Sequence, residues 1–96
     1  MKKKFKDLKF RIDGRFGEDQ TRLIATADLD PGIKVSVVTM LNAPRAIGGA
    51  YGTLPELTFE VAIFQNDGFV KLGEYDDVLG YQSPKQVSKI MKKFQS

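Results

Sequence analysis

Alternating apolar and polar residues predict a β-hairpin in the second half of the chain. Between residues 57 and 65, every second side chain points to the same side of an extended strand. The Asn66-Asp67-Gly68 sequence favours a tight turn, because asparagine and glycine tolerate the positive φ angles of hairpin turns. Residues 69–72 then return as the second strand. The apolar face of the first strand carries Leu57, Phe59, Val61 and Ile63.

Three earlier segments alternate in the same way and predict further strands, at residues 8–12, 20–29 and 33–41. A turn separates the last two, because Pro31 presets φ and Gly32 accepts the positive φ that can follow. The expected core faces are Leu8, Phe10 and Ile12 in the first strand, Leu23, Ala25, Ala27 and Leu29 in the second, and Ile33, Val35, Val37, Thr39 and Leu41 in the third.

Residues 83–95 change to helical spacing. Ser83 is a favourable N-cap, Pro84 suits the first helical turn, and Gln86 completes a capping box. The residues Val87, Ile90, Met91 and Phe94 follow at i, i+3, i+4 and i+7 and form one apolar stripe. The sequence therefore predicts an α+β fold, an antiparallel sheet of four to five strands with one C-terminal helix packed on one face. The 96 residues are expected to form a single domain.

The longest stretch without a periodic pattern is residues 42–56. Connections of this length without structure of their own are usually functional or disordered. We interpret this stretch as a candidate interaction loop, with Arg45, Ile47 and Tyr51 as anchor residues. Its glycines do not make a phosphate-binding loop, because no lysine followed by serine or threonine is present and a strand is expected next.

The predicted sheet carries more apolar surface than one helix can cover. Ile24, Val38, Met40 and Phe64 fall on the face opposite the expected core. A contiguous exposed apolar patch usually marks an interaction site. Three alternatives remain open: the sheet curls so that both faces meet, two copies pack sheet to sheet, or a different protein covers the patch. The expected function is non-catalytic binding, with a second copy or another protein as the partner.

Charge is concentrated at the two ends of the chain. The net charge is +3, but residues 1–11 and 83–96 are strongly basic and the middle of the chain is acidic. Residues 1–4 are expected to form a basic N-terminal arm. Nucleic-acid binding is therefore the alternative function, through one patch if the termini lie close together. The residues predicted for it are Lys2, Lys3, Lys4, Lys6, Lys9, Arg11, Lys85, Lys89, Lys92 and Lys93.

The sequence contains neither histidine nor cysteine. This excludes histidine-dependent triads and structural zinc sites. The densest acidic group, Glu74, Asp76 and Asp77, precedes the predicted helix, where the helix dipole favours it, and it lacks the spacing of a calcium-binding loop. We expect no enzymatic activity, no metal and no cofactor. No segment approaches the roughly 20 apolar residues of a membrane span, so we expect a cytoplasmic protein without a membrane partner.

Several sequence features in the C-terminal part resemble small uncharacterised proteins encoded by phages and prophages. These features are Glu60-Val61-Ala62-Ile63-Phe64, the Asn66-Asp67-Gly68 turn, Asp77-Val78-Leu79-Gly80-Tyr81 and the Ser83-Pro84 helix start. The resemblance transfers no functional residue. It implies a small accessory protein of a phage or mobile element that acts by binding a component of the host.

Overall fold

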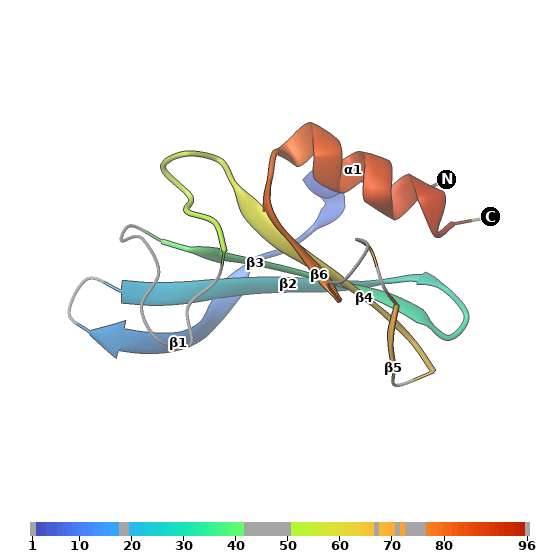
Figure 1. The fold of residues 1–96 in the computed structure, drawn as a ribbon, viewed down its shortest axis with the longest axis horizontal. Coiled ribbons are helices and arrows are strands. Elements are labelled where there is room, and N and C mark those ends of the chain that lie inside the picture. Colours follow the sequence, from blue (N-terminus) through green and yellow to red (C-terminus); the bar gives the residue numbers. More distant parts are fainter. Residues whose placement is uncertain are drawn as a thin grey trace.

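The computed structural model describes residues 2–17, 20–41, 51–66, 68–70, 72 and 77–95. Figure 1 shows a twisted sheet with the C-terminal helix beside it and the two chain ends close together. The elements are the 3-10 helix η1 (Phe5–Asp7), the strands β1 (Arg11–Gly17), β2 (Gln20–Asp30), β3 (Ile33–Met40), β4 (Phe59–Gln65), β5 (Gly68–Val70) and β6 (Val78–Gln82), and the helix α1 (Pro84–Lys93).

The sheet has six strands, and neighbouring strands pair in an antiparallel manner. Strands β1 to β5 follow one another in chain order, and β6 pairs with β4 beside β5. The predicted antiparallel sheet and C-terminal helix are confirmed. The sheet includes one strand beyond the predicted four to five, because the sequence analysis did not identify β6. This strand has five residues with Gly80 in the middle, so its alternation is too short to recognise.

One face of the sheet shares a large apolar cluster with α1. Val87 and Met91 of the helix are fully buried in this cluster together with residues of β3 and β4. The helix begins as predicted, since the Ser83 hydroxyl accepts a hydrogen bond from the amide of Gln86 at 3.2 Å and the Gln86 side chain accepts one from the Ser83 amide. The buried residues of the cluster are Leu29, Val35, Val37, Phe59, Val61, Ile63, Val87 and Met91.

The opposite face carries a second, smaller apolar cluster. Val38 and Met40 form its buried part, and Ile24 packs against them. Ile24 lies directly across from Val38 in the β2–β3 pairing, so their side chains share a face. Met40 has no exposed surface and Val38 is 9% exposed. These two side chains are therefore buried within a single chain, without a second copy or another protein to cover them.

Three expectations about burial fail near strand ends, and one of them is Leu41, which follows β3 and is 40% exposed. Ile12 was expected in the core, yet its side chain is 52% exposed. The first strand begins at Arg11, because residues 5–7 form a 3-10 turn, and Leu8 and Phe10 pack against the main cluster before the strand starts. Leu57 is likewise 55% exposed, because it lies in a turn before β4 begins. Alternation therefore extends beyond the segments that form strands.

The end of the β3–β4 connection is ordered by backbone hydrogen bonds. The amide of Met40 donates to the Gly52 carbonyl at 3.1 Å, and the amide of Leu54 donates to the Met40 carbonyl at 2.8 Å. Gly52 is required here, since an added Cβ would lie 2.6 Å from the Thr58 carbonyl oxygen. Residues 51–56 of the expected loop are thus structured. Arg45 and Ile47 lie outside the described residues.

Candidate nucleic-acid interface

The N-terminal segment lies alongside helix α1. The amide of Lys3 donates to Oε1 of Gln95 at 2.7 Å, and Nε2 of Gln95 donates back to the Lys3 carbonyl at 2.9 Å. Two residues further along, the amide of Phe5 donates to Oγ of Ser88 at 2.9 Å. These bonds join residues at the two ends of the sequence. Within the described residues, the N-terminal segment and the C-terminal helix are therefore neighbours.

Three phenylalanine rings attach this segment to the sheet. The rings of Phe5 and Phe59 meet edge to face with centroids 4.9 Å apart, and Phe10 lies 5.7 Å from Phe59 and 6.0 Å from Phe5. Phe59 is 1% exposed and belongs to the main cluster. Edge-to-face packing is a favoured aromatic arrangement. The residues before Phe5 are therefore held beside α1.

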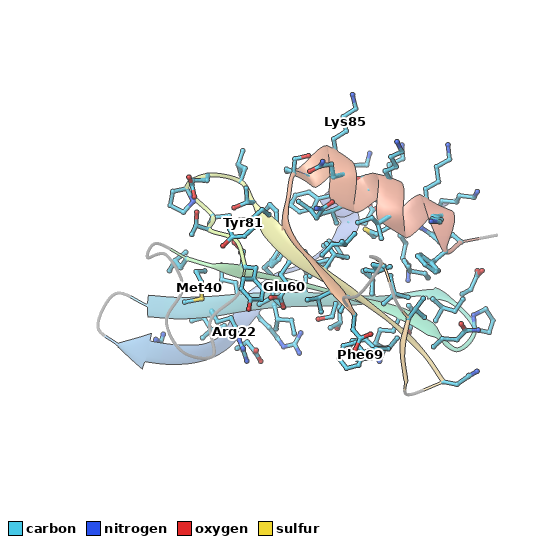
Figure 2. The ribbon with its side chains drawn as sticks, in the orientation of Figure 1. Arg22, Met40, Glu60, Phe69, Tyr81 and Lys85 are labelled. Atoms are coloured by element: carbon cyan, nitrogen blue, oxygen red, sulfur yellow. The ribbon has the colours of Figure 1, made fainter. Side chains whose placement is uncertain are left out.

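The lysines of α1 lie on the side of the helix away from its buried residues. At 100° per residue, Lys85, Lys89, Lys92 and Lys93 fall within an arc of about 100°, and Val87 and Met91 lie opposite. All four lysines are exposed. Figure 2 shows the Lys85 side chain pointing away from the sheet. The first turn of α1 contains no acidic residue, and Lys92 and Lys93 occupy the last turn.

The exposed lysines of the N-terminal segment and of α1 lie on neighbouring elements. We refer to them together as the basic surface: Lys2, Lys3, Lys4, Lys6, Lys85, Lys89, Lys92 and Lys93. Asp7 is the one acidic residue in these segments, and its carboxylate accepts a hydrogen bond from the Lys4 amide at 2.8 Å. Lys3 Nζ donates to the Asp28 carbonyl at 2.6 Å. Two ion pairs in the described part of the chain involve other residues: Arg22 pairs with Asp13, and Lys34 pairs with Asp28, whose carbonyl Lys3 contacts.

Two of the ten predicted basic residues are not part of this surface as defined. Arg11 pairs with Ile24 across β1 and β2, so its side chain shares the face of the second cluster. That face is opposite the one to which α1 contributes Val87 and Met91. Lys9 is exposed and lies between Leu8 and Phe10, which pack against the main cluster.

The residues predicted for protein interaction do not form one patch. Ile24, Val38 and Met40 are together in the second cluster. Phe64 lies on the same face but further along β4, where it pairs with Lys34 of β3. The Ser36–Ala62 pair separates it from Val38. The Phe64 ring contacts Phe69 of β5 with centroids 4.5 Å apart, and Phe69 is 54% exposed. Figure 2 shows Phe69 on the side of the sheet away from α1.

Tyr51, the remaining predicted anchor, pairs with a residue that sequence reasoning missed. Its ring lies 6.3 Å from that of Tyr81 in β6, at 56° between the ring planes. Tyr51 is 48% exposed and Tyr81 is 56% exposed. The Tyr81 amide donates to the Tyr51 carbonyl at 2.8 Å, and the Tyr51 amide donates to Oε1 of Glu60 at 3.2 Å. The local sequence Gly80-Tyr81 does not predict this pairing.

The described residues contain no group of three or more aspartate, glutamate, histidine or cysteine side chains that could hold a metal ion. Glu74 and Asp76 of the predicted acidic group lie outside the described residues. In the same part of the chain, no helix has the length and apolar character needed to cross a membrane. Comparisons with protein families, with curated proteins and with solved structures found no match.

Proposed function

We propose that this protein is a non-catalytic binding protein and that its basic surface binds nucleic acid. The arrangement of the lysines carries the proposal. Val87 and Met91 of α1 are buried in the main cluster, and the lysines on the other side of the helix are exposed. The hydrogen bonds of Lys3 and Phe5 place the N-terminal lysines beside this helix. Phosphate groups of nucleic acid are the anions that such a surface fits.

The spacing of the helix lysines supports an external anion. Lys85, Lys89 and Lys93 follow one another at i and i+4, where like charges repel and destabilise a helix by about 0.2–0.5 kcal/mol for each pair. A solvated helix face usually offsets this repulsion with acidic residues. Within the described residues, none of these three lysines has an ion-pair partner. Bound phosphates would provide the missing negative charge.

The test compares a helix variant with a matched control. Replacing Lys85, Lys89 and Lys93 together by glutamine removes three charges with little change in helix propensity. We expect DNA affinity, measured by fluorescence anisotropy, to fall roughly tenfold, because each exposed ionic contact contributes about 0.2–1 kcal/mol. The control is Lys34→Gln, which removes an exposed charge on β3 outside the basic surface. Equal affinity of the triple variant and the wild type would refute the proposal.

A second candidate function is protein association, and the contact between the partly buried Phe64 and the exposed Phe69 favours it. Aromatic side chains are frequent energetic centres of protein interfaces. A sheet-to-sheet dimer would place this pair against a second copy. We expect the sedimentation coefficient of the wild type to rise with concentration in that case, and Phe69→Ser to remove the effect. A monomer at every concentration would argue against self-association.

A further inference from the structure

Tyr81 has a backbone conformation that tyrosine rarely adopts. Its φ angle is +55°, in the left-handed region that favours glycine and is unfavourable for bulky residues. Burial does not compensate for this strain, because the side chain is 56% exposed. Strained residues that persist in native structures cluster at binding and catalytic sites. The conformation coincides with a β-bulge, because Gly80 and Tyr81 of β6 oppose Glu60 alone on β4, and bulges re-aim side chains near binding sites.

The surrounding hydrogen bonds hold the backbone of both tyrosines. The Tyr81 amide is bonded to the Tyr51 carbonyl at 2.8 Å, and the Tyr51 amide is bonded to the Glu60 carboxylate at 3.2 Å. Gly80 permits the close approach, because an added Cβ would lie 2.7 Å from Cβ of Tyr51. The Gln82 side chain donates to the Gly80 carbonyl at 3.0 Å. The aromatic pair is thus preorganised by backbone contacts on both sides.

The pair lies close to the basic surface along the chain. Lys85 follows Tyr81 by four positions, so their Cα atoms are at most about 14 Å apart. Figure 2 shows Tyr81 on the strand that leads directly into the start of α1, where Lys85 lies. A short nucleic-acid strand is long enough to contact both. The combination of a basic surface with exposed aromatic rings is the one used for single strands.

We propose that Tyr51 and Tyr81 stack on unpaired bases, so that the protein binds single-stranded nucleic acid in preference to duplex. This inference rests on the proposed function of the basic surface. Base faces are covered by their neighbours inside a duplex, whereas an unpaired base presents its π face to an aromatic side chain. The lysines contact phosphates in either form of nucleic acid. The tyrosine pair is therefore the part of the surface that distinguishes the two forms.

The test uses Tyr81→Gly, which removes the ring and also relieves the backbone strain. The probes are a single-stranded oligothymidine and a DNA hairpin with the same number of phosphates. We expect the affinity for oligothymidine to fall about tenfold and the affinity for the hairpin to remain nearly constant. We also expect equal or higher resistance to urea, because glycine adopts a positive φ without steric cost. If Tyr81 were needed only for folding, the variant would instead be less resistant to urea and would show no selective loss of affinity for oligothymidine.

Two further variants complete the test. Tyr81→Phe keeps the ring and should keep the preference for oligothymidine. Tyr51→Ala keeps the Cβ beside Gly80 but removes the ring, and it should reduce this preference. Tyrosine fluorescence gives a direct readout, since the chain has three tyrosines and no tryptophan, and stacking should quench it.

Equal losses of affinity for both probes, or no loss for either, would overturn stacking without contradicting the proposed role of the basic surface. Failure of the wild type to bind either probe would overturn both proposals. A preference for a cationic peptide over oligothymidine would assign the pair to a protein partner and would also overturn stacking.

Discussion

Met40 illustrates at the residue scale how alternation and burial differ. Strand alternation places this residue away from the main cluster, and the face is correctly predicted. The side chain nevertheless has no exposed surface, since it forms a second cluster with Val38 and Ile24. A lysine at position 40 would therefore unfold the protein and would not report on association, because burying an unpaired charge is costly.

We expect Met40→Ala to lower the free energy of unfolding by about 2–5 kcal/mol, the usual cost of truncating a fully buried methionine. Urea denaturation measures this change. The control is Leu41→Ala at the adjacent position, where the side chain is 40% exposed, and we expect a loss below about 1 kcal/mol. If the two variants were equally stable, Met40 would not belong to a second core.

The sequence predicts the direction of a side chain better than its exposure. Period-two spacing identified Val35, Val37, Val61 and Ile63 as one face, and all four are fully buried. The same spacing placed Ile12 and Leu57 with them, although both are more than half exposed. Exposure depends on which strand lies alongside, and that information is absent from local spacing.

At the scale of elements, the N-terminal segment and α1 act as a pair. Phe5 connects them, because its ring contacts Phe59 in the core and its amide bonds to Ser88 on the helix. Together with the Lys3–Gln95 hydrogen bonds, Phe5 positions the lysines on either side of it. Removal of its ring should therefore affect both stability and binding.

We expect Phe5→Ala to lower the free energy of unfolding by roughly 2 kcal/mol, less than for a fully buried phenylalanine, since the residue is only partly buried. We also expect weaker binding to DNA, because Lys2, Lys3 and Lys4 lose their fixed position beside α1. Urea denaturation and anisotropy measure the two effects. Phe69→Ala, which removes a ring of the same size from an exposed position, should leave DNA binding unchanged. Unaltered binding by Phe5→Ala would show that the segment is not part of the interface.

The elements that the sequence predicted best are those with long regular patterns. Strands β2, β3 and β4 and the capped helix α1 agree closely with the predicted segments. Strand β6 was missed because Gly80 interrupts five residues of weak alternation. The pairing of Tyr51 with Tyr81 and that of Lys3 with Gln95 join distant positions, and no local pattern encodes such contacts.

For the molecule as a whole, the fold separates its charges. The described N-terminal segment and α1 bring eight exposed lysines together with one aspartate, whereas the ion pairs found in the described residues lie on β1, β2 and β3. Grouped charges of one sign create a field that attracts oppositely charged polymers. The sequence predicted that the ends are basic, and the structure adds that the ends are neighbours. The account therefore depends on one surface built from both ends of the chain.

The salt dependence of DNA binding tests this account most directly. The logarithm of the association constant should fall linearly with the logarithm of salt concentration, with a slope of about −3 to −5 if four to six of the lysines contact phosphates. Replacing Lys85, Lys89 and Lys93 by glutamine should reduce the size of that slope by up to about three units, and Lys34→Gln should leave it unchanged. A slope near zero for the wild type, or the same slope for the triple variant, would contradict the account.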